Sequence, residues 1–297
     1  MYRITKKRQL SEVVWLMDID APHVAEHCEP GQFVIVRTDE EGERIPLTIC
    51  DYDRQTGSVT IVFQPLGVAT LKLLKYEEGD EILDMVGPLG CASELIDEDP
   101  EVLKGMKLLF VAGGVGTAPV YPQVKWLHER GIDADVIIGA RNKDLLFFED
   151  EMRAVAGNLY ITTDDGSYVR KGLVTDVITD LVENQGKKYD RCISIGPMIM
   201  MKFCCLTTQK YNIPTIVSMN PIMVDGTGMC GACRLTVGDE VKFACVDGPE
   251  FDGFKINWNE CMKRMQMYKT EEGRAKLAYE EGDTHHGGCG HCDGGDK

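Results

Sequence analysis

Short apolar segments separated by turn residues fill the first hundred positions of the chain. Gly, Pro and Asp interrupt the apolar segments at positions 30–31, 56–57 and 78–80, and one helical stretch, 68–76, follows Gly67. Several short strands joined by turns are typical of a small antiparallel barrel. The expected strands are 12–17, 32–37, 58–63 and 81–85.

The pattern changes at Lys107, where strand-length apolar runs begin to alternate with helical periodicity. The run 107–112 is largely apolar, as in a parallel strand buried on both faces. A helix through Val120, Val124 and Leu127 follows and ends at Gly131. This alternation predicts a doubly wound α/β domain of about five strands. Its other expected elements are strands 135–138, 159–163, 192–195 and 215–218, a helix over 173–183, and a helix after Pro197.

The chain therefore divides into four expected parts. They are a β-barrel over 1–100, an α/β domain over 101–219, a cysteine-containing module over 220–257, and a C-terminal helix and tail over 258–297. The last helix is expected over 258 to about 281, and the apolar residues on one of its faces, from Trp258 to Tyr268, are interpreted as packing residues. The tail contains Cys289, Cys292 and three histidines, which could hold a metal, but its many glycines favour disorder.

Composition narrows the class of protein. The 297 residues carry a formal net charge of −16, from 32 basic and 48 acidic side chains, which argues against a nucleic-acid or anionic-membrane partner. The first residues lack the apolar core of a signal peptide, and no apolar run reaches the roughly 18 residues of a membrane span. We therefore expect a reducing, cytoplasmic compartment, in which the 12 cysteines serve metal or redox chemistry.

A glycine-rich loop spaces Asp225, Cys230, Cys233 and Cys245 at x4, x2 and x11. Plant-type iron–sulfur clusters use Cys-x4-Cys-x2-Cys and a distant fourth cysteine, so Asp225 stands where the first cysteine is usual. The loop glycines permit positive φ and close approach of backbone N–H groups. Zinc more often takes two separated Cys-x2-Cys pairs. The sequence therefore favours a cluster over a zinc site or three ordinary buried cysteines.

The fourth ligand remains open at this point. Asp225 is expected to donate a carboxylate oxygen to one iron. In the alternative, Asp225 is a turn residue and another cysteine, Cys204, Cys205 or Cys261, completes the site. The cysteines outside the loop are otherwise interpreted as small buried hydrophobes, namely Cys28, Cys50, Cys91, Cys192, Cys204, Cys205 and Cys261.

A second glycine-rich turn begins at the end of the strand 107–112. Gly113, Gly114, Gly116 and Thr117 follow this strand and open a helix, the arrangement that brings a pyrophosphate to a helix N-terminus. The spacing is Gly-Gly-x-Gly rather than Gly-x-Gly-x-x-Gly, so a plain tight connection is the alternative. Two further strand ends should lie at the same edge of the sheet. They carry Gly139, Ala140 and Arg141, and Gly196 and Pro197.

Charged residues at that edge of the sheet indicate which nicotinamide nucleotide would bind. Arg141 is either a partner for a phosphate or a surface arginine. Asp164 and Asp165 follow another strand, and their carboxylates would repel a 2′-phosphate, which favours NAD(H) over NADP(H). In the barrel, Thr48 could supply a hydroxyl to a flavin ring, and the helix after Gly67 could face its pyrophosphate. From these barrel residues alone, an ordinary barrel core is the better interpretation.

The order of these motifs along residues 1 to about 260 resembles the ferredoxin–NADP reductase superfamily. More narrowly it resembles the electron-transfer subunit of dihydroorotate dehydrogenase, and most of all the small subunit of NADH-dependent reduced ferredoxin:NADP oxidoreductases, of the sulfide dehydrogenase type. The resemblance implies a nicotinamide nucleotide at Gly113, Gly114, Gly116, Thr117, Arg141 and Gly196, and a [2Fe–2S] cluster at the cysteine loop. It also implies FAD at Pro46, Leu47, Thr48, Phe63, Gln64, Gly67, Ala69 and Thr70.

Two positions depart from the pattern that the resemblance implies. The superfamily usually has Arg where this chain has Ile45, and Arg44, one residue earlier on a strand, would face the other side. Asp225 is the second departure. The dihydroorotate type has Cys there and the ferredoxin:NADP type is expected to have Asp, so this position favours the latter.

The expected function is therefore an electron-transfer subunit linking NAD(H), FAD and a [2Fe–2S] cluster within an electron-bifurcating complex. Its implied partner is a larger flavin and iron–sulfur subunit that handles NADP(H) and ferredoxin. The chain shows no identifiable catalytic acid or base. The alternative in the same class is a dihydroorotate dehydrogenase subunit. The alternative from another class is a redox-responsive or metal-binding adaptor, suggested by the Cys/His tail.

Overall fold

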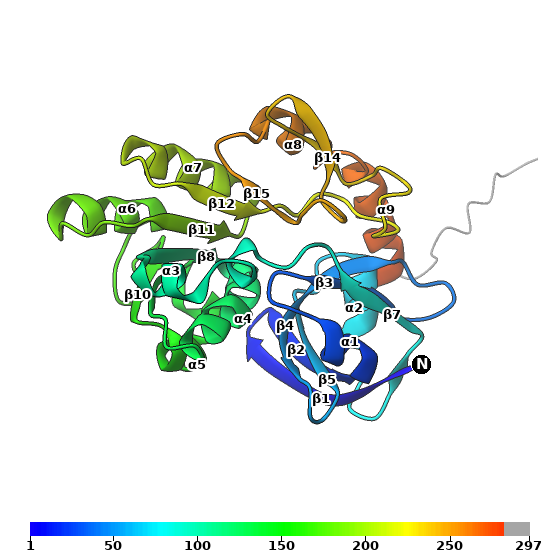
Figure 1. Cartoon of the computed structure of the whole chain (residues 1–297). Coiled ribbons are helices and arrows are strands. Elements are labelled where there is room, and N and C mark those ends of the chain that lie inside the picture. The colour runs from blue at the N-terminus through cyan, green and yellow to red at the C-terminus, as the bar shows by residue number, and fades with distance from the viewer. Residues whose placement is uncertain (282–297) are drawn as a thin grey trace, which may run out of the picture.

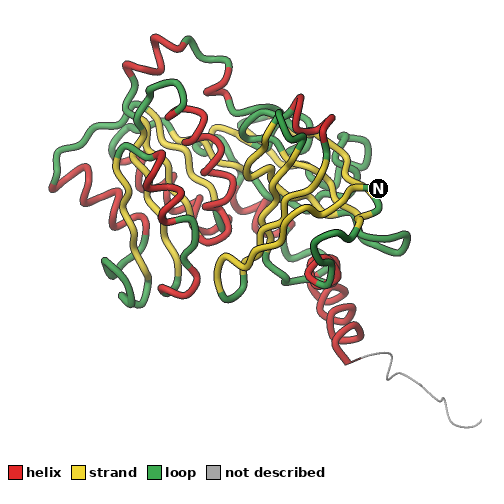
Figure 2. The backbone as a smooth tube through the Cα atoms, turned by 90° about the horizontal axis from the view of Figure 1, so that it is seen from below, coloured by secondary structure: helices red, strands yellow, loops and turns green. Residues whose placement is uncertain are grey.

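A computed structural model describes residues 1–281, and the predicted Cys/His tail lies outside them. Figure 1 shows an N-terminal barrel beside a parallel sheet, with a smaller cysteine-containing module above both. Figure 2 shows, from below, helices on both faces of the parallel sheet. Within the described residues, no helix has the length and apolar character needed to cross a membrane.

The N-terminal unit is a seven-stranded antiparallel sheet that closes most of the way into a barrel. Strand order is β6-β1-β2-β5-β4-β3-β7. Its interior is filled by side chains such as Ile4, Met17, Ile61 and Phe63, which are almost fully buried. The elements are β1 (Tyr2–Ser11), β2 (Val14–Asp20), α1 (Pro22–His27), β3 (Phe33–Arg37), β4 (Ile45–Asp53), β5 (Ser58–Phe63), α2 (Val68–Leu74), β6 (Glu81–Ile82) and β7 (Asp84–Leu89).

The second unit is a doubly wound parallel sheet. Its parallel strands follow the order β10-β9-β8-β11-β12, so the direction of winding reverses between β8 and β11. All six residues of β8 are buried, because helices cover the sheet on both sides. The strands are β8 (Leu108–Gly113), β9 (Ala134–Ala140), β10 (Asn158–Thr163), β11 (Arg191–Ile195) and β12 (Thr215–Ser218). The helices are α3 (Pro100–Gly105), α4 (Thr117–His128), α5 (Glu149–Val155), α6 (Val174–Thr179) and α7 (Met198–Lys210).

Alternate residues of β8 face the two halves of the core. Phe110 packs with the side chains of α4 and α5, whereas Leu109 and Val111 pack with those of α6 and α7. The sequence prediction of a buried strand between two helical layers is thus confirmed, and the carboxyl end of β8 lies at the centre of the sheet.

The third unit, residues 219–264, joins the parallel sheet rather than standing alone. It contains β13 (Arg234–Val237), β14 (Glu240–Phe243), β15 (Glu250–Asp252) and α8 (Trp258–Arg264). Strand β15 pairs antiparallel with β12, from Ser218 opposite Glu250 to Ile216 opposite Asp252. Its core also includes Phe33 and Ile35 of the barrel, so one apolar cluster spans the module and the barrel.

The predicted fold class is confirmed, but the C-terminal helix and the first strand differ from what the sequence led us to expect. The helix expected over 258–281 is two helices, because the chain turns at Tyr268, whose φ of 66° is left-handed, before α9 (Lys269–Glu281) begins. Tyr268 is exposed and does not pack as expected. The ten-residue strand β1 was not expected, because Ile4 is its one buried residue and Lys6, Lys7 and Arg8 interrupt any apolar run.

Gly90 should be irreplaceable where the barrel meets the third unit. Its φ is 74°, and a Cβ there would lie 2.8 Å from the Gly248 carbonyl oxygen and 2.9 Å from the Phe33 ring. We predict that Gly90→Ala lowers the free energy of unfolding by at least about 1–2 kcal/mol, the cost of the left-handed conformation alone. Denaturant unfolding measures this loss.

Gly273→Ala is the matched control for this substitution. Gly273 lies in α9 with no atom within 4 Å of its Cβ position, so alanine should be neutral or raise stability by about 0.5–1 kcal/mol. Equal stability of the Gly90→Ala protein and the unsubstituted protein would contradict the proposed tight contact.

Candidate functional site

Two glycine turns meet at the carboxyl edge of the parallel sheet, where the winding reverses. A Cβ on Gly116 would lie 2.2 Å from the Ile195 carbonyl oxygen, and a Cβ on Gly196 would lie 3.1 Å from the Gly113 backbone. The turn after β8 therefore packs directly on the turn after β11. Ligands of open α/β sheets bind at this switch point.

The turn after β8 leads without a break into α4. Gly114 has a φ of 53°, and Thr117, which is buried, donates a hydrogen bond from Oγ1 to the Gly114 carbonyl oxygen at 2.9 Å. The structure thus brings together Gly113, Gly114, Gly116, Thr117 and Gly196, which the sequence had placed in separate segments.

Arg141 lies one strand further along the same edge. It follows β9, the neighbour of β8, and its side chain is exposed. Its backbone carbonyl accepts a hydrogen bond from the Asp165 N–H at 3.2 Å. Backbone and side-chain hydrogen bonds involving Ser167 hold the pKa of Asp165 below its usual value, so this carboxylate is charged at neutral pH. The edge beyond the glycine turns therefore presents one cation and one anion.

The barrel has an opening between β4 and β5. The two strands pair from Ile49 opposite Ile61 onward, but β4 residues 45–48 pair only with β3. Pro46, Leu47 and Thr48 are consequently half-exposed along this opening. Phe63, at the end of β5, is buried in the barrel core, so it supports the opening from below rather than lining its surface.

Helix α2 begins just beyond this opening. Thr70 Oγ1 accepts hydrogen bonds from the backbone N–H groups of Leu66 and Gly67, at 3.0 and 3.2 Å, and donates to the Gly67 carbonyl oxygen. Gly67 is exposed with open space around it, and Ala69 is buried beneath the helix. Thr70 thereby fixes the entry into α2, while Gln64 lies half-exposed on the connection to it.

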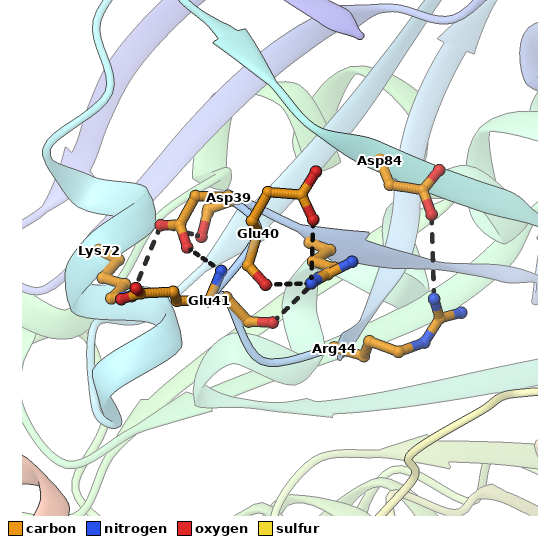
Figure 3. A network of polar contacts seen from close by, with 9 residues as sticks. Asp39, Glu40, Glu41, Arg44, Lys72 and Asp84 are labelled. Carbon is orange, nitrogen blue, oxygen red and sulfur yellow. Dashed lines mark hydrogen bonds and ion pairs between the residues drawn. The ribbon is translucent and has the colours of Figure 1, made fainter.

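A polar network stiffens the loop between β3 and β4, as Figure 3 shows. Lys72 of α2 pairs with Asp39 at 3.5 Å, and Arg44 pairs with Asp84 of β7 at 3.9 Å. Arg44 Nε also donates to the Val224 carbonyl oxygen at 3.3 Å, directly before Asp225. The Arg44 side chain therefore contacts β7 and the cysteine loop, as expected for a residue that faces away from the opening.

Two of the three sulfur atoms of the cysteine loop lie close together. Cys233 and Cys245 are 1% and 2% exposed, with their Sγ atoms 3.3 Å apart, whereas Cys230 is exposed. Two sulfurs bound to one tetrahedral metal at about 2.3 Å would lie roughly 3.7 Å apart. The Gly228 N–H donates to Cys245 Sγ at 3.1 Å, and the Ala232 N–H donates to Cys230 Sγ at 3.5 Å.

Asp225 shapes the loop around its carboxylate. The N–H groups of Thr227 and Cys230 each donate to one of its oxygens at 2.9 Å. These hydrogen bonds, with that from Thr227 the strongest, lower the pKa of Asp225. Burial raises the pKa of the Cys245 thiol to about 12, so a bound cation must supply the charge that stabilises its thiolate.

The loop fits a two-metal cluster better than a single ion. Among residues 1–281, the three-residue set with ligand atoms all within 4.8 Å of one another is His23, Glu26 and His27, not the cysteine loop. A lone zinc ion requires four mutually close ligands, whereas a two-iron cluster spreads its ligands over two sites. Gly226, Gly228 and Gly231, with φ of 80°, 83° and 65°, supply the predicted left-handed turns.

The remaining cysteines behave as predicted with one exception. Burial raises the pKa of Cys204 and Cys205 to about 12 and that of Cys261 to about 11, so these are inert core thiols. Cys28, Cys50 and Cys192 are also buried. The expectation for Cys91 was wrong. It is exposed, because it follows Gly90 at the junction, and its Sγ donates to the Val246 carbonyl oxygen at 3.3 Å.

The residues that join the three units were not predicted from the sequence. Ser93, Gln123 and Glu250 form hydrogen bonds with one another at the junction. No motif marks Ser93 or Gln123. The one signal was Glu250 itself, an acidic residue at the start of a short strand between Pro249 and Phe251.

The fold and these sites define a class of protein. A barrel opening beside a switch-point glycine turn, with a thiolate loop packed on both, is the arrangement of a ferredoxin–NADP reductase-like chain that carries an iron–sulfur module. The model of the iron–sulfur cluster binding domain of dihydroorotate dehydrogenase B matches residues 220–257. The chain belongs to the family of dihydroorotate dehydrogenase B electron-transfer subunits and their homologues.

Relatives that match over most of their length support this family assignment. A dihydroorotate dehydrogenase B electron-transfer subunit homologue of Thermotoga maritima is 45% identical, covering 93% of this chain and 94% of its own. The electron-transfer subunit of Geobacillus thermodenitrificans is 35% identical, covering 84% and 94%. A Clostridium beijerinckii protein described as uncharacterized and located in the adh 3′ region is 63% identical, covering 98% of both chains.

Solved structures agree with this fold. A chain from an NADH-dependent reduced ferredoxin–NADP oxidoreductase, studied for flavin-based electron bifurcation, is 44% identical with a TM-score of 0.85, covering 95% of this chain and 97% of its own. An Amycolatopsis cytochrome P450 reductase, 17% identical with a TM-score of 0.57 over 70% of this chain and 65% of its own, shares the fold alone.

Gly116→Ala should damage the switch point. Its Cβ would overlap the Ile195 carbonyl oxygen, so the turn after β8 must move away from Gly196. We predict that affinity for a nicotinamide nucleotide falls at least about tenfold, the effect of roughly 1.4 kcal/mol. Titration of the purified protein with NADH measures the affinity.

Gly105→Ala is the control in the same unit, because Gly105 has no atom within 4 Å of its Cβ position. It should leave nucleotide affinity unchanged. Unaltered NADH affinity in the Gly116→Ala protein would show that the contact between the two turns does not shape the nucleotide site.

Proposed function

We propose that the protein is the electron-transfer subunit of an electron-bifurcating NADH-dependent reduced ferredoxin:NADP oxidoreductase, and that it links NAD(H), FAD and a [2Fe–2S] cluster. The observation that carries the proposal is its similarity to a chain of such an enzyme, at 44% identity over 95% of its length. Among the dihydroorotate dehydrogenase B relatives, identity is 45% to the T. maritima homologue and 35% to the G. thermodenitrificans subunit. That subunit type remains the alternative.

The opening of the barrel is the proposed FAD site. Pro46 and Leu47 would face the ring with their apolar surfaces, and Thr48 would offer its hydroxyl to the polar edge. Gly67, Ala69 and Thr70 would present the start of α2 to the pyrophosphate, with Gln64 completing the wall and Phe63 supporting it from the barrel core. A flavin held there would exchange a hydride with a nicotinamide and pass single electrons onward.

The switch point is the proposed nicotinamide site, close to that opening because α4 packs against β4. Gly113, Gly114, Gly116, Thr117 and Gly196 would allow the nucleotide to approach the backbone closely. Arg141 would pair with a phosphate. Asp165 beside it would repel a 2′-phosphate, so NAD(H) is the proposed substrate.

Asp225, Cys230, Cys233 and Cys245 are the proposed cluster ligands. Cys233 and Cys245 lie close enough to share one iron, which leaves Asp225 and Cys230 for the other. The carboxylate has about four lone-pair positions, of which two accept backbone hydrogen bonds and a third faces the Thr227 hydroxyl at 3.4 Å, so one remains for a metal.

A larger flavin and iron–sulfur subunit that handles NADP(H) and ferredoxin is the proposed partner. The relatives named above are subunits, which supports the existence of a partner. The chain itself is acidic, with a net charge of −16, and so is suited poorly to docking an acidic ferredoxin directly. We propose a cytoplasmic location, because the ten cysteines of residues 1–281 are all free.

Turnover assays test the proposed function. The complex purified from its native source should reduce ferredoxin and NAD together at the expense of NADPH, and should not turn over orotate. Orotate-dependent NADH oxidation would instead establish the dihydroorotate dehydrogenase function. The isolated chain should also reduce a dye with NADH, and failure of that flavin-dependent activity would favour an adaptor.

Asp225→Ala tests the unusual ligand. Because a carboxylate oxygen is a harder ligand than a thiolate, its loss should alter the EPR and visible spectra of the cluster and lower the iron content of the protein. Asp225→Cys should restore the iron content with spectra that differ from those of the unsubstituted protein.

Asp247→Ala is the control for loop damage. Asp247 accepts a hydrogen bond from the Phe243 N–H at 2.6 Å in the same unit, as Asp225 does from its own loop. It should change stability without changing the spectra. Spectra of the Asp225→Ala protein identical to those of the unsubstituted protein would refute ligation by Asp225.

A further inference from the structure

A ring of three side chains closes at the point where the barrel, the parallel sheet and the cysteine-containing unit meet. Gln123 Nε2 lies 2.6 Å from Glu250 Oε1, and Ser93 Oγ lies 2.9 Å from Glu250 Oε2. Ser93 Oγ also lies 3.3 Å from Gln123 Oε1, which completes the ring. Ser93 and Gln123 are only 1% and 2% exposed and Glu250 is half-buried, so water cannot replace a partner that Ser93 or Gln123 lacks.

The number of protons in the ring determines whether ionised or protonated Glu250 allows all three hydrogen bonds to form. If Glu250 is ionised, the single Ser93 hydroxyl proton must go to Glu250, and Gln123 Oε1 has no donor in the ring. If Glu250 is protonated, it donates to Ser93 Oγ, Ser93 donates to Gln123 Oε1, and Gln123 Nε2 donates to Glu250. Rotating the Gln123 amide by half a turn leaves this conclusion unchanged, because two oxygens would then face each other and need a proton between them.

Each member of the ring belongs to a different unit. Ser93 follows β7 and Gly90 and donates its N–H to the Pro30 carbonyl oxygen of the barrel at 2.8 Å. Gln123 lies on α4, seven residues after Gly116. Glu250 begins β15, five residues after Cys245. The ring therefore connects the segments that carry the proposed flavin, nucleotide and cluster sites.

Few charged groups face Glu250. Glu94 is the one that acts on it from the neighbouring segment, and Glu94 is itself paired with Arg191 at 2.9 Å. On α4, the nearby Lys125 is paired with Asp51 of the barrel at 2.7 Å. Burial raises the pKa of Glu250 to about 7, and the repulsion of Glu94 adds to it, against the hydrogen bonds from Ser93 and Gln123.

We propose that Glu250 is a proton-linked positioning residue. Its protonated carboxyl group closes the ring and holds the cluster-bearing unit against the barrel and α4, and its ionisation opens the ring and loosens that junction. Electron transfer between the flavin and cluster sites would then slow as pH rises, while hydride transfer would not. Only this kinetic consequence rests on the proposed function; the ring itself does not.

Stability measurements test the ring without any activity. The unfolded state releases this proton at a lower pH than the folded state, so the contribution of Glu250 to stability is lost as pH rises through about 7. The unfolding temperature of the holoprotein should fall by about 3 °C between roughly pH 6 and pH 8 from this group. Glu250→Gln keeps all three hydrogen bonds, because its amide mimics the protonated carboxyl, and should abolish this fall.

Two further variants separate the ring from general damage. Asp239→Asn removes an exposed carboxylate from the β13–β14 turn and should keep the full pH dependence of the unsubstituted protein. Glu250→Ala leaves Ser93 and Gln123 without partners and should be less stable than Glu250→Gln at every pH. An unfolding temperature of Glu250→Gln that follows pH as the unsubstituted protein does would overturn the proposal.

Rapid-mixing experiments on the protein loaded with flavin and cluster provide the second readout. After mixing with NADH, the rate of flavin bleaching should be the same in both proteins. The rate at which the reduced-cluster EPR signal appears should fall several-fold between about pH 6 and pH 8 in the unsubstituted protein and stay level in Glu250→Gln. Parallel pH profiles in the two proteins would refute the positioning role. Absence of flavin bleaching by NADH at any pH would instead refute the proposed function, with the unfolding result still deciding the ring.

Discussion

The pairing of β15 with β12 is the constraint on which the arrangement of the three sites depends. Three residues of the cysteine-containing unit add an antiparallel edge to an otherwise parallel sheet. Their backbone hydrogen bonds fix the chain just after Cys245 relative to the carboxyl edge of the sheet. The same chain segment then contacts the barrel, because the Cys91 N–H donates to the Gly248 carbonyl oxygen at 2.7 Å. One short strand and the turn before it thus connect the cysteine-containing unit to both of the other units.

Close backbone packing at the junction explains why small residues recur there. The chain at Gly90 passes so near Gly248 and Phe33 that no side chain fits. Gly226 is in the same situation, since a Cβ there would lie 2.8 Å from Leu89 and 2.9 Å from Ile35 of the barrel. Shielding by apolar barrel side chains keeps water from this side of the cysteine loop, while Cys230 stays exposed on the other side.

Much of this fold could be predicted from sequence because its strongest signals are local. The strand 58–63 and the strand 215–218 were predicted with the bounds that the structure shows, since turn residues flank each apolar run. The glycine turn after β8 could likewise be recognised from a segment of only eight residues. Strand β15 could not be predicted, because three residues carry no periodicity and its partner lies some thirty residues away in sequence. The Ser93–Gln123–Glu250 ring was hidden for the same reason, since its members are far apart in the chain.

The Asp225 carboxylate has a structural role in the cysteine loop that its position in the motif does not reveal. A cysteine at this position could offer one sulfur to iron but could not accept strong hydrogen bonds from two backbone N–H groups. The carboxylate accepts both, from Thr227 and Cys230, and so shapes the loop. Arg44 holds the preceding residue, Val224, to the barrel. The loop is thus organised from the barrel side, and a cysteine in place of Asp225 would keep a potential ligand for iron but lose these two hydrogen bonds.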